Sequence, residues 1–522
     1  MDNKGKRAFQ MASPLKNARS LAILTFFGFV AFSPTFFNLF SWDDTYLVLE
    51  NERIKDISNI AGFFKSTWAG GTSYELYNLQ NRPYYRPVAE ASLALDYAIA
   101  GADPLVFHLT NLVLHIASAI ALFYLLRKVV TCVAPQTPPS FLLLVTLLWL
   151  VHPVHTEAVA LASYRTTLLS GLFLFLSLLF LFSRKISWKI AVGFFFYALS
   201  LLSKETSACL PLLLCLLDAY SNNLGKKRLL FVYIPLGLVT FLWFLWHQSI
   251  TSSGIYDFFA GLSSWQKVLM AFRIFFLYVR LCVLPYPLCP FYDFYVLGVP
   301  SSLLESDILA GLVLFVLLIF LAIVTVKSFK LVSLGIAFFF VSLLPFSHIV
   351  PFFDPAGERF LYVPLAGFLT ATVAGFFFMY QRFSSFRPAL RWLAILTAFA
   401  FALLTFTRMQ KWHDSKTILI ETVKNFPNSV EARLGLGRLL LEEGNPCDAK
   451  PHLERALTLA KNTSAPFGLL ATALAMCEDF KGARDLLMRA PLPERGLPSA
   501  VQIVRTELLK RRMFEVLKVL GI

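Results

Sequence analysis

The sequence has 522 residues, of which 57% are hydrophobic and only 15% are charged, and it contains 53 phenylalanines. Its mean hydropathy of +0.64 excludes an ordinary soluble domain and is typical of a polytopic membrane protein. The net charge of +15 comes from Lys and Arg clusters between apolar stretches, which predicts membrane orientation and argues against nucleic-acid binding.

The first apolar segment, residues 21–40, is long enough to cross a bilayer. No small-residue cleavage site follows it, so we expect a retained first helix. Basic residues precede it and predict a cytoplasmic N-terminus; they are Lys4, Lys6, Arg7, Lys16 and Arg19.

Further basic clusters mark the cytoplasmic ends of later segments and predict about eleven transmembrane helices. The expected spans are residues 21–40, 107–126, 140–156, 166–183, 188–203, 206–220, 229–248, 308–326, 331–350, 360–380 and 390–408. Residues 268–284 are also apolar, but Arg273 and Arg280 lie seven residues apart on one helical face. We therefore expect an interfacial helix whose cations meet lipid phosphates.

The first extracytoplasmic loop, residues 41–106, begins with Trp42-Asp43-Asp44 at the membrane boundary. A carboxylate at this depth can act as a base on a lipid-borne substrate, although two solvated charges at a helix end are the simpler alternative. Other polar runs lie at helix ends on the same side: His152 to Glu157, Lys204-Glu205 and Glu358-Arg359. Because charge at membrane depth is costly, these runs predict a shared polar cavity.

Two of these runs have alternative interpretations. His152, His155 and Glu157 have residue types that suit a divalent cation, but the same run can cap a loop. Lys204-Glu205 can equally be a buried ion pair. We therefore predict no resident metal ion or other cofactor, with a divalent cation as the alternative.

After Met409 the composition changes and a repeat of 34 residues appears, the length of a tetratricopeptide unit. Ala449, Leu453 and Ala456 recur as Ala483, Leu487 and Ala490. The sequence thus predicts an all-α protein with a membrane domain over residues 1–408 and a helical-repeat domain over residues 409–522. An odd number of crossings places the repeats outside the cytoplasm, and an unrelated pair of amphipathic helices is the alternative to repeats.

The polar motifs together resemble one family. The matching elements are Trp42-Asp43-Asp44, Tyr85-Arg86-Pro87, Phe107-His108-Leu109-Thr110-Asn111, His152-Pro153-Val154-His155-Thr156-Glu157, Ser203-Lys204-Glu205-Thr206 and Glu358-Arg359-Phe360-Leu361-Tyr362. In this order they resemble the transmembrane-and-tetratricopeptide-repeat protein O-mannosyltransferases, polytopic glycosyltransferases of the GT-C type, and their bacterial relatives. The sequence departs from that pattern in having Tyr164-Arg165 and a much shorter repeat array.

The resemblance implies transfer of a sugar, such as mannose, from a polyprenyl-phosphate donor to a protein Ser/Thr hydroxyl, with inversion. It implies Asp43 as the general base, with Asp44 sharing that role, orienting the acceptor or binding a metal ion. Arg165, Lys204 and Arg359 are the expected phosphate ligands. The expected supporting residues are Tyr85, Arg86, His152, His155, Glu157, Glu205, Glu358 and Tyr362.

The expected partners are the lipid-linked sugar, membrane lipids and a protein acceptor recruited by the repeats. A lipid or polysaccharide acceptor, and a non-enzymatic scaffold or transporter, are the alternative functions. The short repeat array favours the bacterial inner membrane over the endoplasmic reticulum.

Overall fold

The computed structural model describes residues 14–68, 84–183, 185–251, 259, 261–349, 354–492 and 499–522. Within these ranges the chain is helical and contains no strand, which confirms the predicted all-α class. The basic residues Lys4, Lys6 and Arg7, and residues 81–83 of the first loop, lie outside the described part of the chain.

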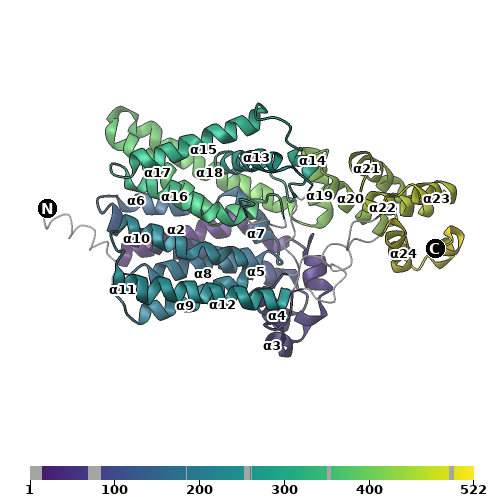
Figure 1. Cartoon of the computed structure of the whole chain (residues 1–522), viewed down its shortest axis with the longest axis horizontal. Helices are drawn as coiled ribbons and strands as arrows, with labels where there is room; N and C mark the ends of the chain where they lie inside the picture. Colours follow the sequence, from purple (N-terminus) through teal and green to yellow (C-terminus); the bar gives the residue numbers. More distant parts are fainter. Residues whose placement is uncertain are drawn as a thin grey trace.

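A helix lies at each of the eleven predicted spans, and most of these helices run side by side along the long axis of the molecule (Figure 1). They are α2 (Pro14–Phe32), α5 (Pro104–Val133), α6 (Pro139–Leu150), α8 (Arg165–Leu181), α9 (Trp188–Ser203), α10 (Leu210–Tyr220), α12 (Ile234–Thr251), α15 (Ser306–Thr325), α16 (Lys330–Leu343), α17 (Pro364–Arg382) and α18 (Arg387–Lys411).

Not all of these helices are long enough to cross a membrane unaided. Among the described residues, six helical stretches are long and apolar enough: Asn17–Phe37, Pro104–Val133, Lys226–Thr251, Ser306–Thr325, Pro364–Arg382 and Ser384–Lys411. A seventh is present if α6 and the segment Pro153–Ala160, bent by 49°, form one span. These helices support a multi-pass membrane protein, while the number of eleven crossings stays a prediction.

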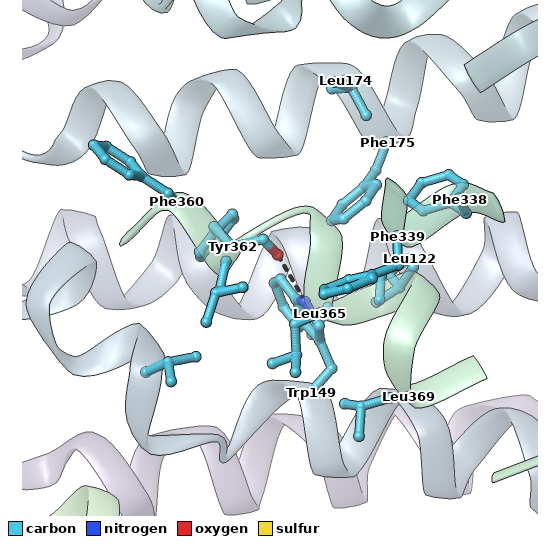
Figure 2. Close-up of a cluster of buried hydrophobic side chains, with 14 of the residues drawn as sticks. Leu122, Trp149, Leu174, Phe175, Phe338, Phe339, Phe360, Tyr362, Leu365 and Leu369 are labelled. Atoms are coloured by element: carbon cyan, nitrogen blue, oxygen red, sulfur yellow. Dashed lines mark hydrogen bonds between the residues drawn. The ribbon is translucent and has the colours of Figure 1, made fainter. Parts of the chain in front are cut away.

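The bundle core is built on large aromatic side chains. Trp149 of α6 is fully buried, and its indole Nε1 donates a hydrogen bond of 2.9 Å to the carbonyl of Tyr362 (Figure 2). Phe175 of α8 and Phe339 of α16 lie in the same cluster. This packing joins α6, α8 and α16 directly beneath the segment that carries Arg359.

Gly171 of α8 makes this close packing possible. A Cβ atom there would lie 2.5 Å from Cε1 of Tyr362, whose hydroxyl is fixed by a 3.0 Å hydrogen bond with His115. We expect Gly171→Ala to lower the free energy of unfolding by about 1–3 kcal/mol, because the added Cβ overlaps the Tyr362 ring and the ring or helix α8 must shift. Thermal unfolding in detergent measures this, with Gly375→Ala in α17 as the control because nothing lies within 4 Å of its Cβ position. Equal melting temperatures would contradict the packing.

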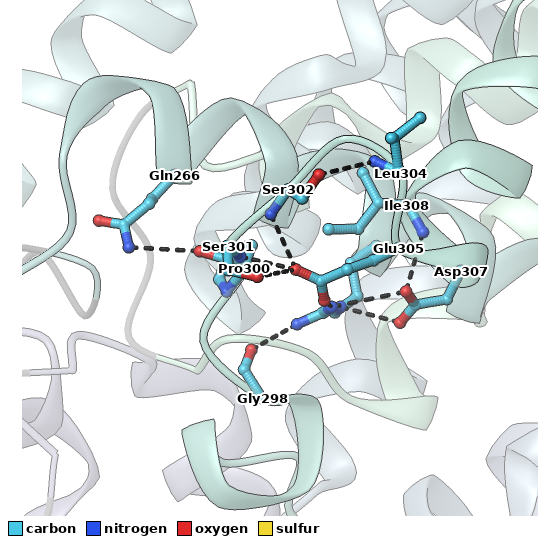
Figure 3. Close-up of polar contacts among 10 residues, drawn as sticks. Gln266, Gly298, Pro300, Ser301, Ser302, Leu304, Glu305, Asp307 and Ile308 are labelled. Carbon is cyan, nitrogen blue, oxygen red and sulfur yellow. Dashed lines mark hydrogen bonds and ion pairs between the residues drawn. The ribbon is translucent and has the colours of Figure 1, made fainter.

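Helix α13 (Ser264–Val283) is the apolar segment expected at the interface. Near one end Gln266 donates to the carbonyl of Pro300 at 3.2 Å (Figure 3), and near the other the carbonyl of Cys282 lies 3.2 Å from Nε2 of His152. Both ends thus meet loops on the predicted extracytoplasmic side. Its interfacial placement stays a prediction.

The buried Arg273 of α13 has protein partners. Its Nε donates to Asp307 at 2.8 Å, and its guanidinium also pairs with Glu305. Serines around Glu305 hold that carboxylate in place (Figure 3). Arg273 thus pairs with two carboxylates of the protein, and its contact with a lipid phosphate stays a prediction.

The C-terminal part forms successive helices that extend away from the bundle (Figure 1). They are α19 (Ser415–Asn425), α20 (Val430–Glu442), α21 (Pro446–Leu459), α22 (Ser464–Met476), α23 (Phe480–Met488), α24 (Ala500–Lys510) and α25 (Phe514–Leu520). Gly444, Glu478 and Arg512 all adopt positive φ, at 78°, 64° and 57°, in the turns after α20, α22 and α24. The turns therefore recur with the period of the sequence repeat, and the tetratricopeptide assignment stays a prediction.

Trp42 joins these helices to the membrane domain. It has a φ of 53°, its backbone N–H donates to Oγ of Ser415 at 2.9 Å, and its side chain packs against the apolar clusters of both parts. Just before Trp42 in the chain, the N–H of Leu39 donates to the carbonyl of His413 at 2.8 Å. The start of the C-terminal part is thus fixed beside Asp43.

Candidate active site

A polar cavity of 110 Å³ lies between the first loop, the ends of the bundle helices and the start of α20. Residues from six separate parts of the chain, counting the first loop as one, line it: Trp42, Asp43, Leu47, Trp68, Tyr84, Arg86, Ser163, Tyr164, Thr166, Lys204, Phe291, Asp354, Arg359, Phe360 and Glu431. We call this cavity the Asp43 pocket. Of the predicted catalytic and phosphate-binding residues, it brings together Asp43, Lys204 and Arg359.

Asp43 is the carboxylate that faces the pocket. It lies in the turn before the short helix Thr45–Leu49 and is partly exposed to the cavity. Burial raises the pKa of Asp43 to about 7, against the opposing charge of Arg359 and a hydrogen bond from Tyr164. A carboxylate with a pKa near neutrality is a suitable general base.

Asp44 faces the other way and has a different environment. It is fully buried, and its two carboxylate oxygens accept hydrogen bonds from the backbone N–H groups of Ala162, at 3.0 Å, and Ser163, at 2.7 Å. Burial raises the pKa of Asp44 to about 6, while these N–H groups oppose the rise. The predicted catalytic role of Asp44 is therefore corrected: its contacts fix the first loop to the turn before α8.

Arg359 is a cation of the pocket that two carboxylates hold in place. Its guanidinium pairs with Glu157 and, at 2.6 Å, with Asp354, and its backbone N–H donates to Glu157 at 2.9 Å. The guanidinium also lies over the ring of Tyr164, 4.5 Å from the centroid. The contacts of Glu157 thus hold Arg359 in place, and the role of Glu157 as a supporting residue stays a prediction.

Lys204 and Arg86 complete the positive lining. Nζ of Lys204 donates to Oγ1 of Thr167 at 2.9 Å, and only 3% of the residue is exposed. Arg86 makes a two-point ion pair with Glu205, at 2.7 and 3.2 Å, and lies over the ring of Tyr84. Arg86 was expected only as a supporting residue, whereas the structure places its side chain in the pocket wall.

The prediction that Arg165 binds phosphate is wrong. Its fully buried guanidinium donates to Asn111, to the carbonyls of Ser92 and Phe107, and to Asp96 at 2.5 Å. Arg165 is absent from the pocket lining. It joins α5, α8 and the helix α4 (Pro87–Ala100) as a structural residue.

The remaining supporting residues lie around the pocket without lining it. Tyr85 donates to the carbonyl of Phe64 at 3.0 Å, and its neighbour Tyr84 is the tyrosine of this run that lines the pocket. His155 packs in a buried aromatic cluster with Tyr362, and Glu358 accepts from the N–H of Cys289 at 2.5 Å. These residues support the fold beneath the site.

The metal alternative also depends on geometry. Nε2 of His152 lies beside the carbonyl of Cys282, and its Nδ1 accepts a hydrogen bond from the N–H of Val154 at 3.4 Å. The second contact caps the loop, which was the alternative to metal binding for this run. No group of three or more His, Cys, Asp and Glu side chains within the described ranges is arranged to hold a metal ion.

Several pocket residues were not predicted. Asp354 and Tyr164 lie next to predicted motifs in the sequence, and this proximity was the only sign that they could belong to the site. Glu431, at the start of α20, comes from the C-terminal part, and its N–H lies 3.4 Å from Oδ2 of Asp293. This contact joins segments 138 residues apart, which a sequence motif does not reveal.

No family model matches the sequence. Among curated proteins, it is 24% identical over 458 residues to protein O-mannosyl-transferase TMTC3 of Homo sapiens, covering 78% of this chain and 47% of that protein. It is 23% identical over 463 residues to protein O-mannosyl-transferase F38B6.6 of Caenorhabditis elegans, covering 87% and 65%. The match to protein O-mannosyl-transferase TMTC4 of Mus musculus is 23% over 482 residues, covering 81% and 64%.

The chain is similar to the TMTC protein O-mannosyl-transferases. The similarity extends over most of this chain, as the order of its motifs predicts. The chain spans about half to two thirds of the length of these TMTC relatives.

Proposed function

We propose that this protein transfers a sugar, mannose in the first instance, from a polyprenyl-phosphate donor to a Ser or Thr hydroxyl of a protein. The observation that carries the proposal is the Asp43 pocket itself, in which a carboxylate with a pKa of about 7 shares one cavity with Lys204, Arg86 and Arg359. The similarity to protein O-mannosyl-transferases supports the reaction class.

The pocket suggests a single displacement. Asp43 accepts the proton of the acceptor hydroxyl as its oxygen forms a bond to the anomeric carbon. The bond between that carbon and the phosphate oxygen breaks, and the polyprenyl phosphate leaves with the electron pair. Lys204, Arg86 and Arg359 lower the barrier, because fixed cations stabilise the charge that develops on the leaving phosphate. The configuration at the anomeric carbon inverts.

A route for the lipid chain supports this donor. An apolar cavity of 640 Å³ lies between α13, α15 and α16, where Phe272, Phe315 and Phe340 are among its lining residues. Phe346 also lines it and stacks at 4.4 Å on Phe360, a residue of the Asp43 pocket. A polyprenyl chain in the apolar cavity would therefore place its phosphate beside Lys204 and Arg359.

The acceptor side of the proposal rests on Glu431. This residue brings the first turn of α20 into the pocket wall, opposite the bundle helices. A polypeptide held by the C-terminal helices can thus present its hydroxyl to Asp43 from the same side. We propose that these helices recruit the protein acceptor.

The test is transfer from radiolabelled polyprenyl-phosphate sugars by the purified full chain in nanodiscs, with a protein extract and a lipid extract as separate acceptors. The proposal expects label on protein, and on Ser or Thr after digestion. Label on lipid alone would favour the alternative acceptor, and no transfer from any donor by folded protein would refute the enzyme assignment.

The pH dependence offers an independent check. Burial, with Arg86 and Arg359 nearby, lowers the pKa of Lys204 to about 7. Asp43 must be deprotonated to act, so activity falls as pH drops below about 7 and Asp43 takes up a proton. Lys204 must be charged, so activity also falls as pH rises above about 7 and Lys204 loses its proton. We expect kcat/KM to peak near pH 7. Lys204→Arg should remove the alkaline limb, because arginine stays charged, and an unchanged alkaline limb would contradict the role of Lys204.

A further inference from the structure

Two cysteines of the C-terminal helices lie in direct contact. Cys447 is in the first turn of α21 and Cys477 is the residue that ends α22, and their Sγ atoms are 3.8 Å apart. Both side chains are exposed. We propose that Cys447 and Cys477 form a disulfide bond in the mature protein.

The position of the pair favours a bond over a chance contact. Cys477 directly precedes the left-handed turn residue Glu478, and Cys447 follows the equivalent turn residue Gly444 by three positions. The two turns belong to consecutive helix pairs, and the cysteines beside them are in contact. Both cysteines are therefore fixed by helix ends, and the sulfurs must approach from 3.8 Å to about 2.0 Å to form the bond.

Other cysteines have different surroundings. Cys209, Cys282 and Cys289 are buried, and Sγ of Cys289 donates to the carbonyl of Phe291 at 3.1 Å. A buried thiol in an apolar setting behaves as a small hydrophobe and is inaccessible to an oxidant. The contact of two exposed thiols is what distinguishes Cys447 and Cys477.

Formation of the bond needs an oxidising partner. The two thiols lose two protons and two electrons to the disulfide of a thiol–disulfide oxidoreductase, which becomes a dithiol. Exposure of both sulfurs permits the mixed-disulfide intermediate. Such partners act in the periplasm or the lumen of the secretory pathway, whereas the cytosol keeps thiols reduced.

The bond would have two consequences. It would link α21 covalently to the end of α22 and so restrict the unfolded states of the 447–477 segment. It would also place the C-terminal helices, and with them the Asp43 pocket to which Glu431 belongs, outside the cytoplasm. This inference does not depend on the proposed enzymatic function.

The test is mass spectrometry of the full chain taken from its native membranes. Cells are quenched in acid, free thiols are alkylated before lysis, and the unreduced protein is digested with trypsin. We expect a linked species joining the peptides 439–455 and 462–481, with the other five of the seven cysteines alkylated. Alkylation of Cys447 and Cys477 as free thiols, or pairing of either with another residue, would overturn the proposal.

Two variants test whether the linked peptide arises from misfolding or from oxidation during sample preparation. Cys477→Ser should leave all six remaining cysteines alkylated, because its partner is freed. Cys215→Ser removes an exposed cysteine of α10 and should leave the linked peptide intact. Reduction should lower the melting temperature of the Cys215→Ser protein and leave that of Cys477→Ser unchanged; equal shifts would overturn the proposal.

Discussion

Replacement of Asp43 by Asn is expected to reduce sugar transfer by about 10²–10⁴-fold, the usual contribution of a positioned general base. Asn keeps the shape of the side chain but cannot accept the proton of the acceptor hydroxyl. Because Asp43 is partly exposed to the pocket and carries a raised pKa, we expect its loss to leave the melting temperature nearly unchanged. Initial rates in nanodiscs and thermal unfolding in detergent measure the two effects.

Asp44→Asn is the matched control for this prediction. The carboxylate of Asp44 accepts two backbone N–H groups, and an amide can accept only one of them without turning its own NH₂ toward the other. We expect a loss of about 1–3 kcal/mol in unfolding free energy, the cost of an unsatisfied buried group. Full turnover by folded Asp43→Asn, or the reverse ranking of the two variants in melting temperature, would contradict these roles.

Lys204→Met is expected to lower kcat/KM by about 10²–10³-fold, the typical cost of removing one group that stabilises developing charge. Lys204 lines the pocket together with Arg359, and its ammonium group donates to Oγ1 of Thr167 at 2.9 Å. Methionine fills a similar volume without the ammonium group, so the protein should still fold. Steady-state kinetics with varied donor concentration measure the loss.

Lys128→Met is the control for Lys204. Lys128 of α5 is half-buried and its ammonium group donates to the carbonyl of Leu179 at 2.7 Å, but it is not among the residues that line the Asp43 pocket. We expect this variant to retain its kcat/KM. Equal losses in the two variants would show that removal of a lysine, rather than of a pocket cation, reduces the activity.

The class and the helices were accessible from the sequence, because long apolar stretches and basic clusters directly reflect the bilayer. The lengths of the helices were less accessible. Residues 206–220 were expected to cross the membrane, but helix α10 begins only at Leu210 and has 11 residues. A hydropathy pattern does not show where a polar run such as Glu205 to Cys209 tightens into a separate turn.

The site residues show a sharper limit. Asp43 and Asp44 are adjacent, yet one faces the pocket and the other binds the backbone before α8. In the same way Tyr84, rather than Tyr85, lines the cavity. Motifs identify which short run carries the chemistry, but the direction of each side chain depends on backbone torsions such as the positive φ of Trp42.

For a related reason, the sequence predicted the wrong arginine at the pocket: Arg86 lines it and Arg165 does not. Arg165 was predicted to bind phosphate and Arg86 only to support the site, but Arg165 has Asp96 and two carbonyls around it, and these contacts come from α4 and α5. Partners so distant in the sequence cannot be read from a local motif. Glu431 was missed for the same reason, because its place in the pocket depends on how α20 lies against the membrane domain.

The central claim is a single displacement onto a protein hydroxyl at the Asp43 pocket, and the anomeric configuration of the product tests it most directly. The full chain in nanodiscs is given a polyprenyl-phosphate mannose of defined β configuration and a peptide acceptor, and the glycopeptide is examined by NMR. The account predicts α-linked mannose on Ser or Thr, because one attack assisted by Asp43 inverts the anomeric carbon. A β-linked product, or free mannose with an unmodified peptide, would contradict it.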